Sequence, residues 1–320
     1  MQRVGAIVAV TVGHAEPTKH NKEENHLRTT LEQLLTQQDW IVLDGATGTM
    51  LFEMGLQHGD SPEMWNLEHA DRITRLHQLY VDAGSHVILT NTFGGNRLRL
   101  GLHNLSERAI EINQKAAQIA RAVADQSERG VVVAGSMGPT GSILVPYGEM
   151  EFKTAVEVFA EQAQGLIQGG VDVIWIETMS DLEEVRAAVE GVRQVNPIFP
   201  IVVTMTFDTR GRTMMGVTPE QAIQTLTPMN LTAIGGNCGN GIDEIVGVMR
   251  KMSATGTTVP LIAKSNAGIP KLIKGVAVYD ASPADMATYA TTVKALGVKI
   301  IGGCCGTTPQ HIAAMVATLQ

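Results

Sequence analysis

The sequence has few of the residues that mark several protein classes. Its 320 residues include three cysteines and 4% aromatic residues, and 24 Lys and Arg are outnumbered by 32 Asp and Glu, which gives a formal net charge of −8. Three cysteines cannot form a framework of paired disulfides. Because basic and base-stacking side chains are both scarce, we expect no nucleic-acid partner. Hydrophobic residues nevertheless make up 44%, which excludes a disordered chain.

Long apolar runs are also missing. No stretch reaches the roughly 20 apolar residues that cross a bilayer, so no membrane partner is expected. Residues 4–12 are apolar, follow Arg3 and end near Ala15, a pattern similar to a short signal peptide. Our preferred interpretation is a leader that docks loosely, with export as the alternative. The thiol chemistry argued below favours a reducing, cytoplasmic location.

From residue 39 onward the sequence becomes regular. Eight short runs rich in β-branched residues alternate with segments of helical periodicity, and glycines often end a helix before the next run. Strands that alternate with helices indicate a parallel sheet buried on both faces, and eight such units indicate a closed (β/α)8 TIM barrel. The predicted strands are 41–45, 86–92, 131–136, 171–178, 201–206, 233–238, 261–266 and 299–305.

The domain organisation follows from where this regular pattern begins. We predict a partly flexible N-terminal extension over 1–38 and a barrel domain over 39–320. Leucines at helical spacing predict a short helix over 27–36 that covers one end of the barrel. The rival fold, an open doubly wound sheet, requires a Gly-x-Gly-x-x-Gly turn after the first strand, and residues 44–49 lack that spacing. The extension also offers a surface for a homo-oligomer, and the sequence leaves the oligomeric state open.

The three cysteines fall at the ends of two predicted strands, where barrels of this kind carry their catalytic groups. Cys238 ends the sixth strand, and Cys304 and Cys305 end the eighth. Three thiolates are a soft, compact ligand set for Zn²⁺, and three protein ligands leave one position open, as in catalytic zinc sites. Such a site suits deprotonation of a substrate thiol better than activation of water. The alternatives are a structural zinc module, closed for example by His311, and a redox pair of adjacent cysteines, which the usual Cα separation disfavours.

Other strand ends supply polar groups and close-approach glycines. Glu177 follows an apolar run and is either a partner for an ammonium in the pocket or a surface carboxylate. Asp44 is either a pocket carboxylate or a turn residue, and Trp65 is either core or a ring that receives a cation. The candidate substrate-binding residues are Asp44, Gly45, Trp65, Thr90, Ser136, Tyr147 and Glu177.

The motifs at these positions resemble those of the homocysteine S-methyltransferases. Their order and spacing agree over about residues 38–318. The whole pattern is most similar to the stand-alone bacterial betaine–homocysteine methyltransferases. The matching motifs are Asp44-Gly-Ala-Thr-Gly-Thr49, Thr90-Asn-Thr-Phe93, Gly138-Pro139, Glu177-Thr178, Gly236-Asn-Cys238 and Gly302-Gly-Cys-Cys-Gly306.

The resemblance implies a Zn²⁺-dependent enzyme that methylates homocysteine to methionine. The three cysteines match the family's zinc ligands. Glu177 matches the carboxylate that holds the homocysteine amine, and Asp44 and Gly45 match the first-strand segment beside the substrate. The implied reaction is an in-line displacement, in which the homocysteine thiolate attacks a methyl group on a cationic leaving group.

The residues that would select the methyl donor differ from those of the animal betaine enzymes. Aromatic residues follow the second- and fourth-strand motifs in those enzymes, whereas Gly94 and Thr178 stand there in this sequence. Glu177-Thr178 instead resembles the homocysteine module of cobalamin-dependent methionine synthase. We predict betaine or a related small onium donor, with Trp65 and Tyr147 as an aromatic wall. The alternatives are a methyl-corrinoid on a separate protein, S-methylmethionine, and sulfonium betaines such as dimethylsulfoniopropionate.

Overall fold

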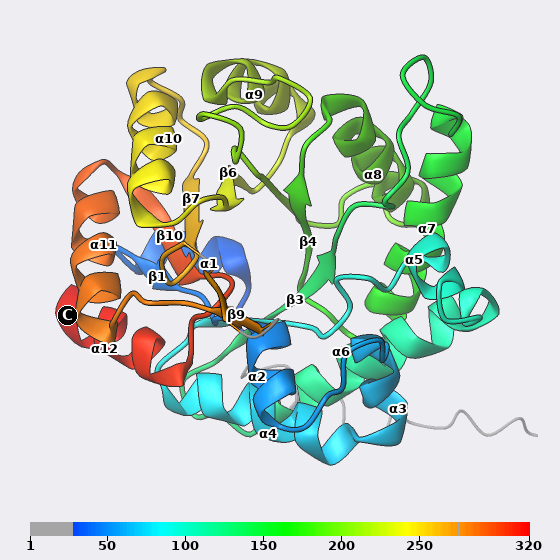
Figure 1. Ribbon diagram of the computed structural model, residues 1–320, viewed down its shortest axis with the longest axis horizontal. Coiled ribbons are helices and arrows are strands. Elements are labelled where there is room, and N and C mark those ends of the chain that lie inside the picture. The colour runs from blue at the N-terminus through cyan, green and yellow to red at the C-terminus, as the bar shows by residue number, and fades with distance from the viewer. Residues whose placement is uncertain (1–27, 270, 274–275) are drawn as a thin grey trace, which may run out of the picture.

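A computed structural model describes residues 28–269, 271–273 and 276–320, so the leader-like segment over 4–15 lies outside the described residues. Within these ranges, eight parallel strands form a barrel with helices around it (Figure 1). This architecture confirms the predicted (β/α)8 TIM barrel. The barrel strands are β1 (Ile41–Val42), β2 (Val87–Leu89), β3 (Val132–Met137), β4 (Val173–Met179), β5 (Ile201–Met205), β6 (Ala233–Cys238), β7 (Leu261–Ser265) and β10 (Val298–Gly303).

The barrel closes where its first strand meets both the last strand and the second. The strands follow the order β1-β10-β7-β6-β5-β4-β3-β2, and β1 pairs in parallel with β10. On its other side, a parallel bridge joins Leu43 to Val87 at the start of β2. The backbone N–H of His86 also donates to the carbonyl of Val42 at 2.8 Å. Because β1 is paired on both sides, the sheet forms a closed ring.

Most of the helices return the chain from one strand to the next. Thr218 and Ser282 cap two of them through capping boxes, and each is followed by Pro at the first helical position, which fixes where these helices begin. The helices are α1 (Leu31–Gln37), α2 (Thr47–Glu53), α3 (Trp65–Glu68), α4 (Ala70–Asp82), α5 (Arg97–Gly101), α6 (Ala109–Asp125), α7 (Phe152–Gln168), α8 (Leu182–Val195), α9 (Pro219–Leu226), α10 (Ile242–Ala254), α11 (Pro283–Ala295) and α12 (Pro309–Leu319).

Side chains alternate along each strand between the barrel lumen and the helices outside. On β4, Ile174 and Ile176 belong to the large outer core, whereas Val173 and Trp175 belong to a separate lumen cluster. The same alternation turns Glu177 toward the lumen at the carboxyl end of the strand. The lumen cluster consists of Leu31, Leu34, Ile41, Leu43, Val87, Leu89, Val132, Ala134, Val173, Trp175, Val202, Ala233, Ile262 and Ile300.

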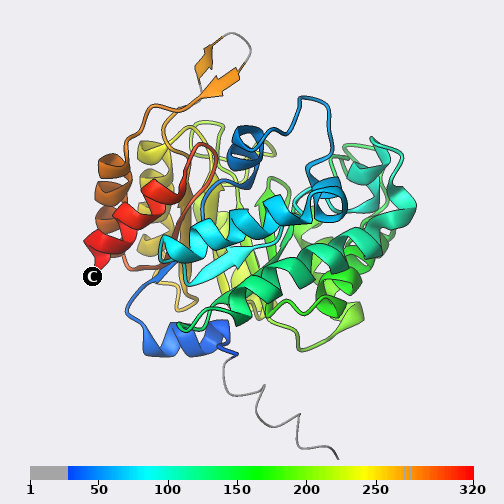
Figure 2. The same cartoon turned by 90° about the horizontal axis from the view of Figure 1, so that it is seen from below.

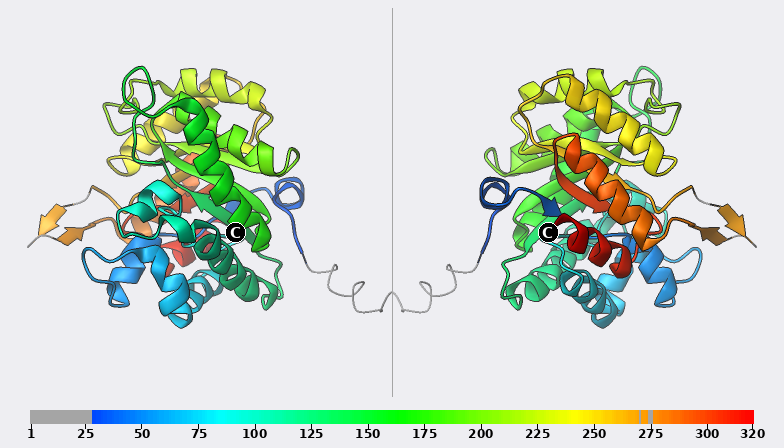
Figure 3. Two further views of the ribbon diagram at one scale, coloured as in Figure 1. Left: turned by 90° about the vertical axis from the view of Figure 1, so that its right-hand side faces the viewer. Right: turned by 90° about the vertical axis from the view of Figure 1, so that its left-hand side faces the viewer.

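Helix α1 covers the amino-terminal end of the lumen, as the leucine spacing predicts. Leu31 and Leu34 are buried in the lumen cluster, and Thr30 caps the helix by accepting from the backbone N–H of Gln33. Figures 2 and 3 show α1 on the opposite side of the barrel from a small hairpin that projects outward. One end of the lumen is therefore closed, and the other is left for a site.

That hairpin is an element that the sequence analysis did not predict. It consists of β8 (Lys271–Ile273) and β9 (Val276–Val278), which pair antiparallel between β7 and α11. Three-residue strands are too short to show a hydrophobic periodicity, so the sequence pattern does not predict them. The short helices α2, α3 and α5, which lie in loops after β1 and β2, were not predicted for the same reason. Within the described ranges, no helix is long and apolar enough to cross a membrane.

Candidate active site

A cavity of about 380 Å³ lies at the carboxyl ends of the barrel strands. It is lined by residues from the carboxyl ends of seven of them, all but β5, which are far apart in the sequence. Most of the residues predicted to form the site line it, whereas Trp65 and Tyr147 do not. The predicted residues in its lining are Asp44, Gly45, Thr90, Ser136, Glu177, Cys238, Cys304 and Cys305.

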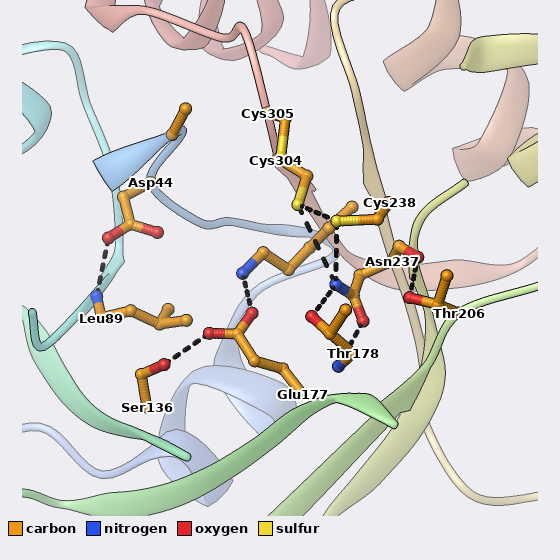
Figure 4. Close-up of polar contacts among 12 residues, drawn as sticks. Asp44, Leu89, Ser136, Glu177, Thr178, Thr206, Asn237, Cys238, Cys304 and Cys305 are labelled. Atoms are coloured by element: carbon orange, nitrogen blue, oxygen red, sulfur yellow. Dashed lines mark hydrogen bonds and ion pairs between the residues drawn. The ribbon is translucent and has the colours of Figure 1, made fainter. Parts of the chain in front are cut away.

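The three cysteines converge at one side of this cavity. Their Sγ atoms lie within 4.8 Å of one another, and those of Cys238 and Cys304 are 2.7 Å apart (Figure 4). Three thiolates bound to one Zn²⁺ at about 2.3 Å each lie within about 4.6 Å of one another, so the cluster fits a single ion. In the part of the chain that the structure describes, the cluster contains only these three ligands. A tetrahedral ion held by these three ligands would keep one coordination position open.

The backbone around Cys304 and Cys305 is fixed by bonds to β7 and the segment after it. Strand β10 ends at Gly303, one residue earlier than the cysteine pair, which corrects the predicted strand end. Cys304 N–H donates to the Ser265 carbonyl at 2.7 Å, and Cys305 N–H donates to Asn266 Oδ1 at 3.1 Å. Hydrogen bonds from Cys238 and Cys304 lower the pKa of Cys305 below the ordinary value of a thiol, which favours the thiolate, the form that binds metals.

Asn237 connects the cysteine cluster to the strand that carries Glu177. Its Nδ2 donates to Thr178 Oγ1 at 2.8 Å and lies 3.5 Å from Cys238 Sγ, while its Oδ1 accepts from Thr178 N–H at 2.9 Å. Thr178 and Cys238 have positive φ values of 63° and 59°, a strained conformation for side chains of these types. The amide of Asn237 holds both strained residues. Asn237 lies in the Gly236-Asn-Cys238 motif, where only the cysteine was predicted to have a role.

Glu177 is paired with a buried lysine that the sequence analysis missed. Lys264 Nζ lies 2.8 Å from Glu177 Oε2, and the two side chains are only 4% and 8% exposed. Ser136 Oγ donates to the other carboxylate oxygen at 2.6 Å. Burial alone would lower the pKa of Lys264, but the negative charges of Glu177, Cys304 and Asp44 raise it above its ordinary value, so the lysine is an ammonium. A lysine inside the apolar run of β7 was the signal, since lysines are almost never fully buried unless paired.

Asp44 is a second buried carboxyl group in the cavity. Its Oδ2 accepts from Leu89 N–H at 2.7 Å, whereas Oδ1 is buried without a hydrogen-bond partner among the described residues. Figure 4 shows this second oxygen directed toward the interior of the site. Burial raises the pKa of Asp44 to about 7. The neighbouring residue must be glycine, because a Cβ on Gly45 would lie 2.7 Å from Thr307 Oγ1 and 2.9 Å from Tyr80 Oη.

A sequence profile described as homocysteine S-methyltransferase matches residues 41–319, which include the whole barrel. The chain belongs to this family. Membership confirms the resemblance carried by the strand-end motifs, together with the predicted enzyme class, a methyltransferase of this kind.

Two methionine synthases are similar to this member of the homocysteine S-methyltransferase family. That of Mycobacterium tuberculosis (strain ATCC 25618 / H37Rv) is 33% identical over 314 residues, and that of Mycobacterium leprae (strain TN) is 31% identical over 315 residues. The matches cover 93% and 94% of this chain but 26% of each relative. The chain thus spans about a quarter of the length of these relatives.

The homocysteine methyltransferase MmuM from Escherichia coli shares the fold of this family member. Its metallated form has a TM-score of 0.77 at 24% identity, and the match covers 90% of this chain and 99% of that one. Its oxidized form has a TM-score of 0.75 at 24% identity, with 90% and 98% covered. At this identity the likeness supports the barrel fold alone.

The predicted aromatic wall is not part of the cavity. Trp65 is 4% exposed in α3, where its ring packs against His69 and lies 4.8 Å from the guanidinium of Arg72. Tyr147 is 80% exposed on the loop between β3 and α7. Packing in the outer core and exposure on a loop therefore keep both rings out of the lining. Phe93 supplies an aromatic ring to the lining instead.

His311 does not join the cysteine cluster. Its Nε2 lies 3.0 Å from the carbonyl of Ala281, and its Nδ1 accepts from Thr308 N–H at the start of α12. Both ring nitrogens are therefore engaged in holding this helix. The histidine closure considered for a structural zinc site receives no support from the geometry.

Proposed function

We propose that this chain transfers a methyl group from a small onium donor to the sulfur of homocysteine, which gives methionine. The observation that carries the proposal is the convergence of three thiols at one side of a cavity that is also lined by Asp44, Glu177 and Lys264. Thiolates suit a soft metal, and buried charges of both signs suit an amino acid. Family membership and the name of the two mycobacterial relatives support the same reaction.

Cys238, Cys304 and Cys305 are the residues that would hold Zn²⁺ in this proposal. A zinc ion bound there supplies an open coordination position that lowers the pKa of a substrate thiol and leaves the sulfur nucleophilic. Asn237 orients Cys238 through its amide and ties it to the strand of Glu177. Partners of this kind fix the direction of the ligand atoms and tune their basicity.

The charged residues bind and orient the acceptor. Asp44 and Glu177 are buried carboxyl groups that accept hydrogen bonds from the homocysteine ammonium, and Ser136 holds Glu177 in place. Thr90 supports this arrangement, because its Oγ1 accepts from the backbone N–H of Ser136 at 3.0 Å. The fixed carboxylates thus set the distance between the amino acid backbone and its sulfur, which is how positioning contributes to rate.

The chemical step is one displacement. A lone pair of the homocysteine thiolate forms the new S–C bond, and the bond between the methyl carbon and the donor heteroatom breaks. The electron pair of that bond stays on the leaving nitrogen or sulfur, which becomes neutral. The thiol proton is lost before the step, so no protein base has to act during it.

A small cationic donor agrees with the outer part of the cavity. Glu63 lines the cavity, is 7% exposed and accepts from Gly94 N–H at 2.8 Å, and the preceding residue, Phe93, lines the same cavity. An anion beside an aromatic ring favours an onium group. Betaine is the donor we propose, with S-methylmethionine, a sulfonium betaine or a methyl-corrinoid protein as alternatives. Because the proposed chemistry requires reduced thiols, we propose a reducing compartment such as the cytoplasm as its location.

The test is a donor panel. The full chain is purified under reducing conditions, its zinc is quantified, and it is incubated with homocysteine and each donor in turn: betaine, S-methylmethionine, dimethylsulfoniopropionate or a methyl-corrinoid. We expect about one zinc per chain and methionine from betaine, measured by mass spectrometry. Methionine from the corrinoid alone would overturn the donor assignment. A zinc-loaded chain that makes no methionine from any donor would overturn the reaction itself.

A further inference from the structure

Lys264 has hydrogen-bonding capacity that the protein does not use. Its side chain is 4% exposed and lines the cavity, and Nζ donates to Glu177 Oε2 at 2.8 Å. An ammonium has three N–H donors. Among the described residues, this is the one hydrogen bond that Nζ makes, and the ring of Trp175 lies on another side at 5.8 Å. A buried ammonium with free donors is costly unless something else satisfies them.

Asp44 presents the complementary deficit in the same cavity. Its Oδ1 is buried and finds no hydrogen-bond donor in the described ranges, while Oδ2 is satisfied by the backbone of Leu89. Both side chains line this cavity, and the positive charge of Lys264 lowers the Asp44 pKa against the larger effect of burial. Within the described residues, the same cavity thus contains Asp44 Oδ1, which lacks a hydrogen-bond donor, and Lys264 Nζ, which has fewer acceptors than N–H groups.

The ion pair with Glu177 does not explain this arrangement by itself. Glu177 already receives Ser136 Oγ at 2.6 Å and Lys264 Nζ at 2.8 Å, one on each carboxylate oxygen. If the Lys264–Glu177 pair served only to stabilise the fold, we would expect the remaining N–H donors of Lys264 to be satisfied by the protein. The unused N–H donors of Lys264 complement an anionic group, and the unpaired oxygen of Asp44 complements an ammonium. A ligand that carries both groups would satisfy both residues.

We propose that Lys264 recognises the α-carboxylate of the acceptor amino acid, while Asp44 receives its ammonium. This inference rests on the proposed function and adds the residue that selects for the carboxylate. The acceptor fits better than betaine or dimethylsulfoniopropionate, because the cationic centre of these two donors has no N–H to give to Asp44 Oδ1. In an α-amino acid the carboxylate and the ammonium are attached to the same carbon. Such a ligand can therefore meet Lys264 and Asp44 at the same time.

The experiment compares two acceptors that differ in one group. Titration calorimetry on the zinc-loaded full chain measures binding of L-homocysteine and of 3-aminopropane-1-thiol, which keeps the ammonium and the thiol but lacks the carboxylate. For the unaltered protein we expect the second ligand to bind about 10- to 100-fold more weakly. In Lys264→Gln, which still donates a hydrogen bond to Glu177, the two ligands should bind within about threefold of each other, because homocysteine loses affinity and the analogue does not.

Two further variants protect the conclusion. Lys153→Met removes a lysine whose side chain is 88% exposed on α7 and should leave the ratio of the two affinities unchanged. Lys264→Met removes the charge and the hydrogen bond together, and its melting temperature shows whether Glu177 tolerates the loss; if it fails to fold, Lys264→Gln decides. Full retention of the carboxylate preference in folded Lys264→Gln overturns the inference. Failure of the unaltered protein to bind homocysteine overturns the proposed function instead, so the two failures are distinct.

Discussion

The two ends of the barrel lumen are built from the same strands, but one end is lined by apolar side chains and the other by charged side chains and thiols. At the amino-terminal end, α1 covers an apolar cluster in which Leu31, Val173 and Ile300 are buried together. At the carboxyl-terminal end, the next positions along the strands carry Glu177, Lys264 and the cysteines. On β4 the change occurs within three alternate residues, from Val173 through Trp175 to Glu177.

This difference shows how a barrel supports a strained and charged site. Buried charges and positive-φ residues cost free energy, and they persist only where surrounding structure holds them. The apolar end stabilises the barrel by burying side chains that need no hydrogen-bond partners. Substitutions at one end should therefore leave the properties of the other end unchanged.

The largest effect should come from Cys304→Ser at the charged end. Removing one thiolate leaves two ligands, so we expect zinc retention to fall below a tenth of an equivalent and methionine formation to fall by at least about 10³-fold, which corresponds to about 4 kcal/mol. Metal analysis and a methionine assay measure both. The unfolding midpoint of the metal-free protein should stay close to that of the unaltered chain. Full zinc occupancy in the variant contradicts the ligand assignment.

The next effect belongs to the apolar end. Leu31→Ala removes a side chain that is 1% exposed under the barrel, and we expect the free energy of unfolding to fall by about 2 to 5 kcal/mol. Zinc content and activity at low temperature should not change, because α1 covers the end of the lumen opposite to the site. Leu102→Ala, at a position 70% exposed, is the matched control and should be nearly neutral. A loss of activity without a loss of stability would show that the ends are coupled.

A smaller effect with a pH signature is expected from Asp44→Asn. Because burial raises the Asp44 pKa to about 7, the carboxyl group is mostly neutral below that pH and ionised above it. Binding of an ammonium should therefore strengthen as pH rises through about 7 and weaken as it falls. L-methionine suits the measurement, since it has the ammonium but no thiol proton. We expect its affinity to rise between about pH 6 and pH 8 in the unaltered protein, and to be flat and up to about 100-fold weaker at pH 8 in the variant. An equal pH slope in both proteins would refute the assignment.

The smallest effect should come from Asn237→Ala. The variant keeps all three thiols but loses the amide that lies 3.5 Å from Cys238 Sγ and holds Thr178. Partners of metal ligands typically contribute 10- to 100-fold in affinity, and we expect about 10-fold weaker zinc binding in a chelator competition. Thr206→Val is a useful comparison, because among the described residues Thr206 Oγ1 makes one hydrogen bond, to the Asn237 carbonyl at 3.0 Å. If the Asn237 variant binds zinc as tightly as the parent, the amide has no role in the metal site.

The sequence predicted the barrel well because its strands are apolar runs that repeat at a regular interval. All eight are present, and the rule that strand ends carry the chemistry brought Asp44, Ser136, Glu177 and the cysteines to one cavity. Lys264 was missed because it lies inside a strand, where the pattern registers only apolar content. Trp65 and Tyr147 were placed at the site by elimination, and no periodicity reports which way a loop side chain turns.

The seam of the barrel joins the two ends of the sequence next to the cysteine cluster. Ala46 N–H donates to Thr307 Oγ1 across 261 positions of sequence, and Tyr80 Oη donates to the Ala46 carbonyl beside it. Contacts of such long range close a large loop, which costs the chain entropy. Cys304 and Cys305 follow β10 beside this seam, whereas Cys238 ends β6. A metal ion held by all three thiols would therefore bind only the chain in which β10 is docked, and would stabilise the closed barrel by that preference.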